Sequence, residues 1–154
     1  MVETVDDIVS MFSLDSCVKC GTCDKVCPSG RNGGIRPDFL IYSIVDAPSS
    51  SRLSELQADI WRCLMCHRCS MSCPEKIDVT GVIRTLRHHS AQSGGIPKRF
   101  RRAKDTLTEV GRAFPMDGLV NRKREDLGLK RIEEDADSLN ELKIIMKRTG
   151  FCDE

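Results

Sequence analysis

Eight of the nine cysteines in this 154-residue chain fall into two runs with the same spacing. The first run contains Cys17, Cys20, Cys23 and Cys27, and the second contains Cys63, Cys66, Cys69 and Cys73. Each cysteine of the second run lies 46 residues after its counterpart, and Pro28 or Pro74 directly follows the last cysteine of each run. The pattern C-x2-C-x2-C-x3-C-P therefore occurs twice, and any fold of this chain has to place both copies.

The spacing within each run is typical of a loop that binds an iron–sulfur cube. Three cysteines at positions i, i+3 and i+6 of a tight loop can reach three irons of one cube, whereas the fourth leaves the loop through proline. In two-cluster ferredoxins that fourth cysteine binds the other cluster. We therefore expect two 4Fe–4S clusters that transfer single electrons, with crossed ligand sets. One cluster is expected to bind Cys17, Cys20, Cys23 and Cys73, and the other Cys63, Cys66, Cys69 and Cys27.

Zinc and disulfides are the two alternative uses of these cysteines. Structural zinc sites usually pair two C-x2-C knuckles across a longer spacer, which four ligands within eleven residues fit poorly. A disulfide framework belongs to oxidising compartments. The N-terminus begins acidic and lacks the basic and apolar regions of a secretory signal, and no stretch approaches 18 uncharged apolar residues. We therefore expect a cytoplasmic protein without a membrane span, whose thiols bind metal.

Charged residues are nearly balanced, with 24 Lys and Arg against 23 Asp and Glu, for a formal net charge of +1. This balance argues against a general nucleic-acid-binding protein, which usually carries a strongly basic domain. Two oxidised cubes with their thiolates would add roughly −4, so the loaded chain would carry about −3. We expect some of the basic residues to offset that charge and to tune the cluster potentials.

Apolar periodicity predicts a mostly helical N-terminal domain over residues 1–96, which carries both clusters. Helices are expected near residues 4–13 and over residues 35–46, the second of them buried. Three serines at 49–51 predict a turn before an apolar stripe. That stripe consists of Leu53, Leu56 and Ile60. Asp78 is expected to cap a further helix, which ends near Gly94, Gly95 and Pro97. Its buried face is expected to contain Val79, Val82, Ile83 and Leu86.

Residues 97–154 contain no motif cysteine and are expected to form a helical C-terminal extension that binds partner subunits. Helices are expected over about residues 99–112 and from about Asp137, with a less regular stretch between them that contains Pro115 and Gly118. The expected apolar face of the last helix consists of Leu139, Leu142, Ile145 and Met146. Gly150 suits the left-handed position that ends a helix, with Phe151 folded back on Met146. No alternating strand pattern appears, so the expected fold class is all-α.

Four other features have both a structural and a functional interpretation. His67 lies inside the second run, but each cube already has four cysteines, so we expect a loop residue whose role is limited to adjusting the potential. Trp61 is expected to pack in the core, with shielding of a cluster from water as the alternative. Cys152 lies outside both runs and is expected to be a free thiol. The basic run 97–104 fits a solvated helix face, a docking surface for an acidic partner or a nucleic-acid contact.

Two cysteine motifs separated by a helical spacer resemble the alpha-helical ferredoxin domain, which occurs in the iron–sulfur subunits of succinate dehydrogenase and fumarate reductase. The chain is more closely similar to the C subunit of heterodisulfide reductases (HdrC). The resemblance rests on residues 17–31, 61–73 and 79–87, on Gly111-Arg and Gly128-Leu, and on the closing Lys147-Arg-Thr-Gly-Phe. It covers nearly the whole chain. Several families share the cysteine motifs, so the size and the C-terminal pattern make the narrower choice.

The resemblance implies an electron relay without an active site of its own. In that family, HdrC takes electrons from HdrA, which contains flavin and iron–sulfur clusters. It passes them to HdrB, which reduces the coenzyme M–coenzyme B disulfide in methanogenesis at noncubane clusters. Those clusters need adjacent cysteines, and this chain has no Cys-Cys pair. We therefore expect HdrA and HdrB as partners, no catalytic residue here, and a larger assembly with a hydrogenase or a formate dehydrogenase as an option.

Two other functions stay open. One is a similar iron–sulfur carrier for a complex that oxidises lactate, glycolate or glycerol 3-phosphate. The other is a metal-stabilised interaction module without a redox role. Neighbouring genes for HdrA and HdrB would favour the heterodisulfide reductase relay over the first alternative. The iron content would distinguish the relay from the second alternative.

Overall fold

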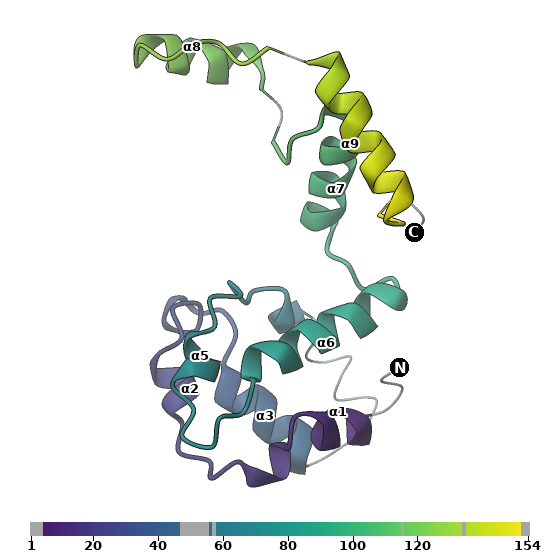
Figure 1. Ribbon diagram of the computed structural model, residues 1–154. Coiled ribbons are helices and arrows are strands. Elements are labelled where there is room, and N and C mark those ends of the chain that lie inside the picture. The colour runs from purple at the N-terminus through teal and green to yellow at the C-terminus, as the bar shows by residue number, and fades with distance from the viewer. Residues whose placement is uncertain (1–4, 47–55, 57, 115, 134, 152–154) are drawn as a thin grey trace. The chain divides into compact units, whose positions relative to one another are not determined.

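The computed structural model describes residues 5–46, 56, 58–114, 116–133 and 135–151. These residues form helices and loops and contain no strand, so the prediction of an all-α fold is confirmed. The chain divides into two compact units, residues 1–96 and residues 97–154 (Figure 1). The predicted serine turn at 49–51, Leu53 and Cys152 lie outside the described residues.

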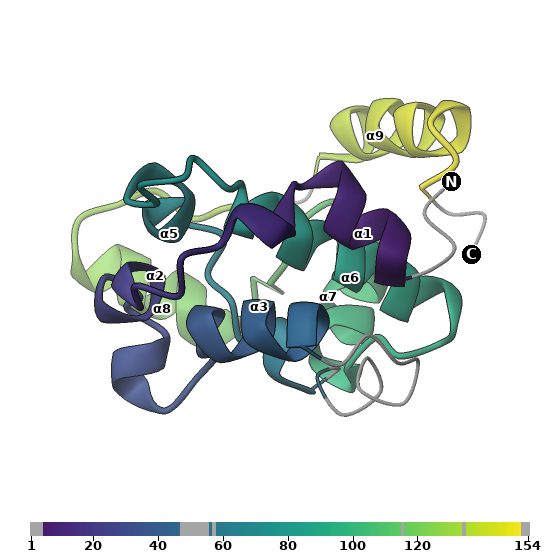
Figure 2. The same ribbon diagram turned by 90° about the horizontal axis from the view of Figure 1, so that it is seen from below.

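The core of the N-terminal unit is formed by helices α1 (Val5–Met11), α3 (Pro37–Asp46) and α6 (Val79–Gln92) (Figure 2). Each helix turns an apolar face inward, as the sequence predicts, and Leu56 and Ile60 of the predicted stripe are also buried. The core is almost wholly aliphatic. Its most deeply buried apolar side chains include Ile8, Leu14, Ile35, Leu40, Ile44, Val82 and Ile83.

The start of α6 is fixed by a cap and by a close contact. As predicted, the Asp78 carboxylate accepts a hydrogen bond from the Gly81 N–H (3.0 Å), and it accepts another from Ser70 Oγ (2.8 Å). Gly81 is buried, and a Cβ at this position would collide with the Phe12 ring and the Asp78 carboxylate. The glycine therefore allows α6 to approach the segment after α1, while Ser70 ties α6 to the second cysteine loop.

Replacement of Asp78 by alanine is expected to lower the free energy of unfolding of the iron-loaded protein by about 1 kcal/mol, because the first turn of α6 loses its cap. The Gly81 N–H lowers the pKa of Asp78. The contribution of the carboxylate is therefore present above its unfolded-state pKa and is lost as the pH falls through the lower folded-state pKa. Asp78→Asn keeps an acceptor and should cost less. Equal losses for both variants in denaturation at neutral pH would contradict the capping role.

The two cysteine runs fold into loops with matching secondary structure. A short helix follows the second cysteine of each run, α2 (Thr22–Lys25) in the first and α5 (Arg68–Met71) in the second. These helices are offset by the same 46 residues as the cysteines. The first run is also flanked by two 3-10 turns, η1 (Leu14–Ser16) and η2 (Gly30–Asn32). Because α2 contacts both α3 and α5, and α5 contacts α6, the two loops lie against each other on the helical core.

The described part of the C-terminal unit contains helices α7 (Lys98–Val110), α8 (Gly118–Asp126) and α9 (Ala136–Arg148). Gly111, which ends α7, lies beside the Leu139 and Leu142 side chains of α9. The apolar side of α9 therefore packs at the end of α7.

Helix α8 corrects one prediction, since the sequence predicts a less regular stretch around Pro115 and Gly118. Asp117 caps the first turn of α8 by accepting from the Val120 N–H (2.9 Å). The Asn121 side chain accepts from the Ile132 N–H (3.0 Å) and donates to the Ile132 carbonyl (3.2 Å). α8 is thus held by polar contacts, and its sequence lacks the apolar periodicity from which helices are predicted.

The end of α9 follows the sequence in all but one respect. Met146 is buried, whereas Ile145, which the sequence places on the same apolar face, is 57% exposed. Gly150 has a φ of 71°, and the Phe151 N–H donates to the Met146 carbonyl (3.0 Å). These are features of the predicted left-handed helix end. The Phe151 ring lies under the Lys104 ammonium of α7, 5.8 Å from the ring centre.

Candidate functional site

The two cysteine loops share an unusual backbone conformation. Lys19 and Met65, which are counterparts in the repeat, have φ values of 53° and 52°. Gly21 and His67, also counterparts, have φ values of 67° and 60°. Non-glycine residues rarely adopt this left-handed conformation, so its recurrence at equivalent positions indicates that both loops are curled by the same structural requirement. The curled backbone turns the three cysteines of each loop toward one side.

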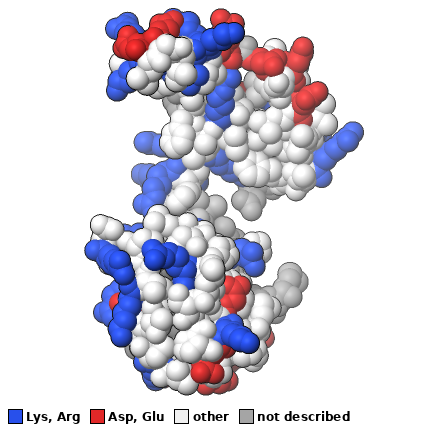
Figure 3. All heavy atoms as spheres, turned by 60° about the vertical axis from the view of Figure 1, so that its left-hand side comes forward, with Lys and Arg blue, Asp and Glu red and all other residues white. Residues whose placement is uncertain are grey.

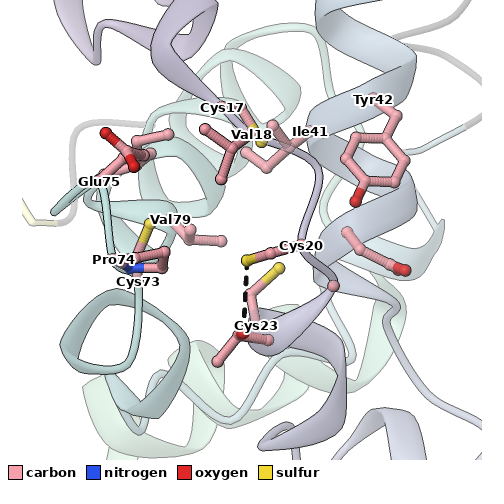
Figure 4. A pocket seen from close by; sticks show the side chains of 14 residues that line it. Cys17, Val18, Cys20, Cys23, Ile41, Tyr42, Cys73, Pro74, Glu75 and Val79 are labelled. Carbon is pink, nitrogen blue, oxygen red and sulfur yellow. Dashed lines mark hydrogen bonds between the residues drawn. The ribbon is translucent and has the colours of Figure 1, made fainter.

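The first loop surrounds a hollow of about 400 Å³, part of which is open to solvent. Cys17, Cys20, Cys23 and Cys73 line it (Figure 4). The wall between them is mostly apolar and includes Val18, Ile41, Ile77 and Val79. Two carboxylates, Asp38 and Glu75, also belong to the lining. Three of the four cysteines come from the first run, and the fourth comes from the end of the second run.

A second hollow of about 310 Å³ is lined by the other four cysteines of the two runs. It is lined by Cys27, Cys63, Cys66 and Cys69. Three of these cysteines belong to the second run and one belongs to the end of the first. The rest of its lining includes His67, Arg68, Thr80 and Ile83. The two groups of four coincide with the crossed sets expected from the spacing, and which sulfur binds which cluster stays a prediction.

The donor set of each hollow fits an iron–sulfur cube. All eight cysteines are free thiols, and soft thiolates are the ligands that such clusters prefer. The four sulfurs of each set surround a hollow and do not converge on a single point, as the ligands of one metal ion would. Within the described residues, no three His, Cys, Asp or Glu side chains converge closely enough to hold a single metal ion.

Hydrogen bonds reach sulfurs of both hollows, including backbone hydrogen bonds to Cys20 and Cys23 of the first. The Gly30 N–H donates to Cys27 Sγ (3.3 Å), and the Met65 N–H donates to Cys63 Sγ (3.4 Å). Cys69 Sγ lies 3.5 Å from the Thr80 hydroxyl. At the first hollow, the Cys20 thiol donates to the Thr22 hydroxyl (3.3 Å). The N–H donors stabilise negative charge on sulfur, which is the form that binds metal.

The thiols of the iron-free chain differ in acidity. Burial, reinforced by the charge of Asp38, raises the pKa of Cys23 to about 12. Burial also raises the pKa of Cys63, although the Met65 N–H and the Arg87 charge oppose it. The hydrogen bond with Thr22 lowers the pKa of the exposed Cys20 thiol. Because thiolates are the ligands, iron binding at neutral pH must release protons, above all from Cys23 and Cys63, whose pKa values are raised.

Arg87 of α6 supports the second loop from behind, and sequence reasoning missed it. Its guanidinium donates to the Ile60 carbonyl (2.9 Å) and to the Cys63 carbonyl (2.6 Å). It also lies over the Trp61 ring, 5.2 Å from the ring centre. The two carbonyls are 27 and 24 residues away in sequence, so no local pattern points to this role.

Ser29 joins the two runs and was also missed. Its hydroxyl donates to the Arg62 carbonyl (2.7 Å) and accepts from the Ile35 N–H (3.3 Å). Arg62 in turn donates to the Gly33 carbonyl (3.0 Å). The exit of the first run is therefore bonded to the entrance of the second, which helps to bring the fourth cysteine of each run to the opposite hollow.

The structure also shows where the other residues considered from the sequence lie. His67 is an exposed loop residue that occupies the left-handed position of Gly21 in the repeat. Trp61 packs against the core, and its indole N–H lies 3.5 Å from Ser90 Oγ. The basic run 97–104 forms the first half of α7, a helix that has no fully buried residue. The run is thus a largely solvated helix face, and its use as a docking surface stays a prediction.

Basic side chains are prominent on the face of the N-terminal unit that Figure 3 shows. Figure 3 shows Lys and Arg spread over the surface turned to the viewer, with Asp and Glu mainly toward its lower edge. Two bound cubes with their thiolates would add roughly four negative charges to this unit. The basic surface is suited to offset part of that charge.

Comparison with known proteins agrees with this site. Residues 13–77 match a family model described as a 4Fe-4S dicluster domain. The chain is 34% identical over 158 residues to the C subunit of the ferredoxin:CoB-CoM heterodisulfide reductase of Methanosarcina mazei, an alignment that covers 98% of this chain and 96% of that protein. The chain belongs to the HdrC family of heterodisulfide reductases. Its cofactors are accordingly two 4Fe–4S clusters.

Two further relatives illustrate the range of the HdrC family. The chain is 32% identical over 157 residues to the C subunit of the ferredoxin/F(420)H(2)-dependent CoB-CoM heterodisulfide reductase of Methanosarcina acetivorans, which covers 98% of this chain and 96% of the relative. It is 34% identical over 117 residues to the C2 subunit of the H(2)/formate:CoB-CoM heterodisulfide,ferredoxin reductase of Methanococcus maripaludis. That alignment covers 76% of this chain and 62% of the relative. Among the described helices, none combines the length and apolarity needed to cross a bilayer.

Proposed function

We propose that this chain relays single electrons through its two clusters, from the flavin-containing HdrA to the catalytic HdrB of a heterodisulfide reductase. The observation that carries this proposal is the pair of adjoining hollows, each lined by four cysteines drawn from both runs. In this arrangement two one-electron centres would be held side by side in one helical unit. Such a pair is suited to pass electrons between partners that contact its two ends.

The proposed ligands of each cluster are the four cysteines that line one of the two hollows, the first and the second cavity. Cys17, Cys20, Cys23 and Cys73 would hold the cluster of the first cavity. Cys63, Cys66, Cys69 and Cys27 would hold the cluster of the second cavity. Each cluster supplies a site that gains and loses one electron. The protein supplies the thiolates, the N–H donors to sulfur and an apolar wall on the side of the core.

The reaction with substrate would take place in another chain. The sequence contains no adjacent pair of cysteines and therefore lacks the motif that noncubane clusters need. The substrate of the whole complex would be the coenzyme M–coenzyme B disulfide, in agreement with the names of the relatives from Methanosarcina. We place the complex in the cytoplasm, with no nucleic acid among its partners.

The C-terminal unit is proposed to bind the partner subunits. It exposes large apolar side chains on and between its helices, which could supply apolar contacts to a partner subunit. They include Phe114, Leu119, Leu127, Ile144 and Ile145. The name of the Methanococcus relative mentions hydrogen and formate, which supports a hydrogenase or a formate dehydrogenase as a further member of the assembly.

The first test is the iron and acid-labile sulfide content of anaerobically prepared protein, with EPR after reduction by dithionite. The proposal predicts about eight irons and eight sulfides per chain and two interacting signals of reduced 4Fe–4S clusters. Zinc in place of iron would contradict it and would favour a structural module. Two clusters that accept no electrons from co-purified HdrA would instead favour a carrier for another oxidoreductase.

A further inference from the structure

We propose that the two cavities stabilise an added electron unequally, because Arg87 lies behind the second cavity and Asp38 lies in the wall of the first. The second cavity would then have the higher reduction potential, and electrons from HdrA would enter at the first cavity and move to the second. The inference rests on the proposed function, since it requires a cluster in each cavity. One electron is lost at the first cavity as one is gained at the second, with no bond broken and no proton moved.

The surroundings of the first cavity carry a negative charge that is poorly compensated. Asp38 and Glu75 belong to its lining, and the Asp38 side chain is only 13% exposed. Arg36 lies 3.2 Å from Asp38, but it also lies 3.6 Å from Asp24 and its own side chain is 61% exposed. One solvated cation thus serves two carboxylates. Among the described residues that line this cavity there is no Lys or Arg.

The lysines of the first loop do not neutralise the negative charge in the wall of the first cavity. Lys19 is ion-paired with Asp46 at 2.8 Å, and both side chains are about half exposed. Lys25 is exposed on α2. Water and salt screen charges at such positions strongly, whereas they screen a largely buried carboxylate such as Asp38 much less.

The second cavity has the opposite character. Its described lining contains Arg68 and His67 and no carboxylate. Behind the loop, the half-buried Arg87 guanidinium lies 2.6 Å from the carbonyl oxygen of Cys63, which is one of the four lining cysteines. Neither Arg87 nor the nearby Asp78 lines the cavity. Asp78 caps α6 through Gly81, whereas Arg87 holds the backbone of a lining cysteine, so a positive charge lies directly behind the loop that would hold the cluster.

Hydrogen bonds to sulfur do not distinguish the two cavities, and burial acts against the second. Backbone N–H groups of Gly30 and Met65 donate to sulfurs of the second cavity, and backbone hydrogen bonds also reach Cys20 and Cys23 of the first. Cys27 and Cys69 are buried, which by itself would disfavour added negative charge. However, Gly30 supplies Cys27 with a hydrogen bond, and the Thr80 hydroxyl lies at hydrogen-bonding distance from Cys69, so protein groups replace the lost water.

The test is an anaerobic redox titration of the full-length, iron-loaded protein, followed by EPR. Wild type is expected to show two one-electron steps. Arg87→Gln should lower the higher step, and Asp38→Asn should raise the lower one. Each should change the equilibrium ratio of reduced to oxidised cluster about tenfold, which is ~59 mV for a one-electron couple. Arg87→Lys keeps the charge and should leave the higher step near its wild-type position. Arg84→Gln, on the exposed side of α6, is the matched control and should move neither step.

The substitution that moves a redox step identifies the cavity to which that step belongs. Movement of the lower step by Arg87→Gln, or of the higher step by Asp38→Asn, would reverse the inferred direction and overturn the proposal. So would the absence of any shift in both variants. If Arg87→Gln fails to retain eight irons, Asp38→Asn alone decides, since it keeps the shape of the side chain. Fewer than two one-electron steps in wild type would instead refute the relay itself.

Discussion

Cys73→Ala will abolish the same EPR signal as Cys20→Ala, although the two cysteines belong to different runs. Both side chains line the first cavity, so either substitution removes a ligand from the same proposed cluster. Each variant should fall from about eight irons to about four per chain and should keep the signal of the other cluster. Iron analysis and EPR of the dithionite-reduced proteins measure both effects.

The second cavity provides the matched pair. Cys27→Ala should share its phenotype with Cys66→Ala, since both residues line that cavity. The crossed assignment would be wrong if Cys73→Ala lost the same signal as Cys66→Ala, because each run would then serve its own cluster. Cys152→Ser, a substitution outside both runs, should retain all the iron.

Removal of iron by anaerobic chelation is expected to unfold the N-terminal unit. The binding free energy of a structural metal site is comparable to the ~5–15 kcal/mol that stabilises a whole domain, so loss of two clusters should exceed what the aliphatic core supplies. A folded iron-free chain would also have to maintain two thiol-lined hollows without their contents. Hydrogen exchange followed by mass spectrometry should show loss of amide protection throughout α3 and α6.

The C-terminal unit is the internal control for that experiment. It contains no motif cysteine, so protection of amides in α7 and α9 should change much less. Full protection of α3 and α6 after iron removal would show that the hydrophobic core alone maintains the fold. The hydrogen bonds of Ser29 and Arg62 between the runs would then be sufficient to hold the loops together.

Local sequence signals were sufficient for the helical core and for the cysteine loops. The cap at Asp78 and the buried face with Val82 and Ile83 follow from a side-chain acceptor next to an apolar stripe of helical period. The end of α9 at Gly150 follows from the freedom of glycine to adopt positive φ. Both kinds of signal involve residues within a few positions of each other, which is why they can be found without a structure.

Features that depend on distant contacts were not predictable. Arg87 reaches carbonyls of the second loop, and its sequence neighbours give no indication of them. Asp38 opens a helix in sequence, and only the fold places it in the wall of a cavity. Helix α8 is held by the polar Asn121 contacts with Ile132, and Ile145 is exposed although it fits the apolar stripe. In each case the deciding partner lies on another element.

The sharing of cysteines between the two runs has a consequence for biogenesis. While the chain is being synthesised, the first run emerges from the ribosome well before Cys73, which lies in the same cavity. Until that residue appears, the nascent first loop offers three cysteines to an incoming cluster, and its own fourth cysteine points to a cavity whose other three walls do not yet exist. With the proposed crossed ligands, the first cluster would gain its fourth cysteine only after synthesis of the second run, so the order of the chain would set the timing of maturation.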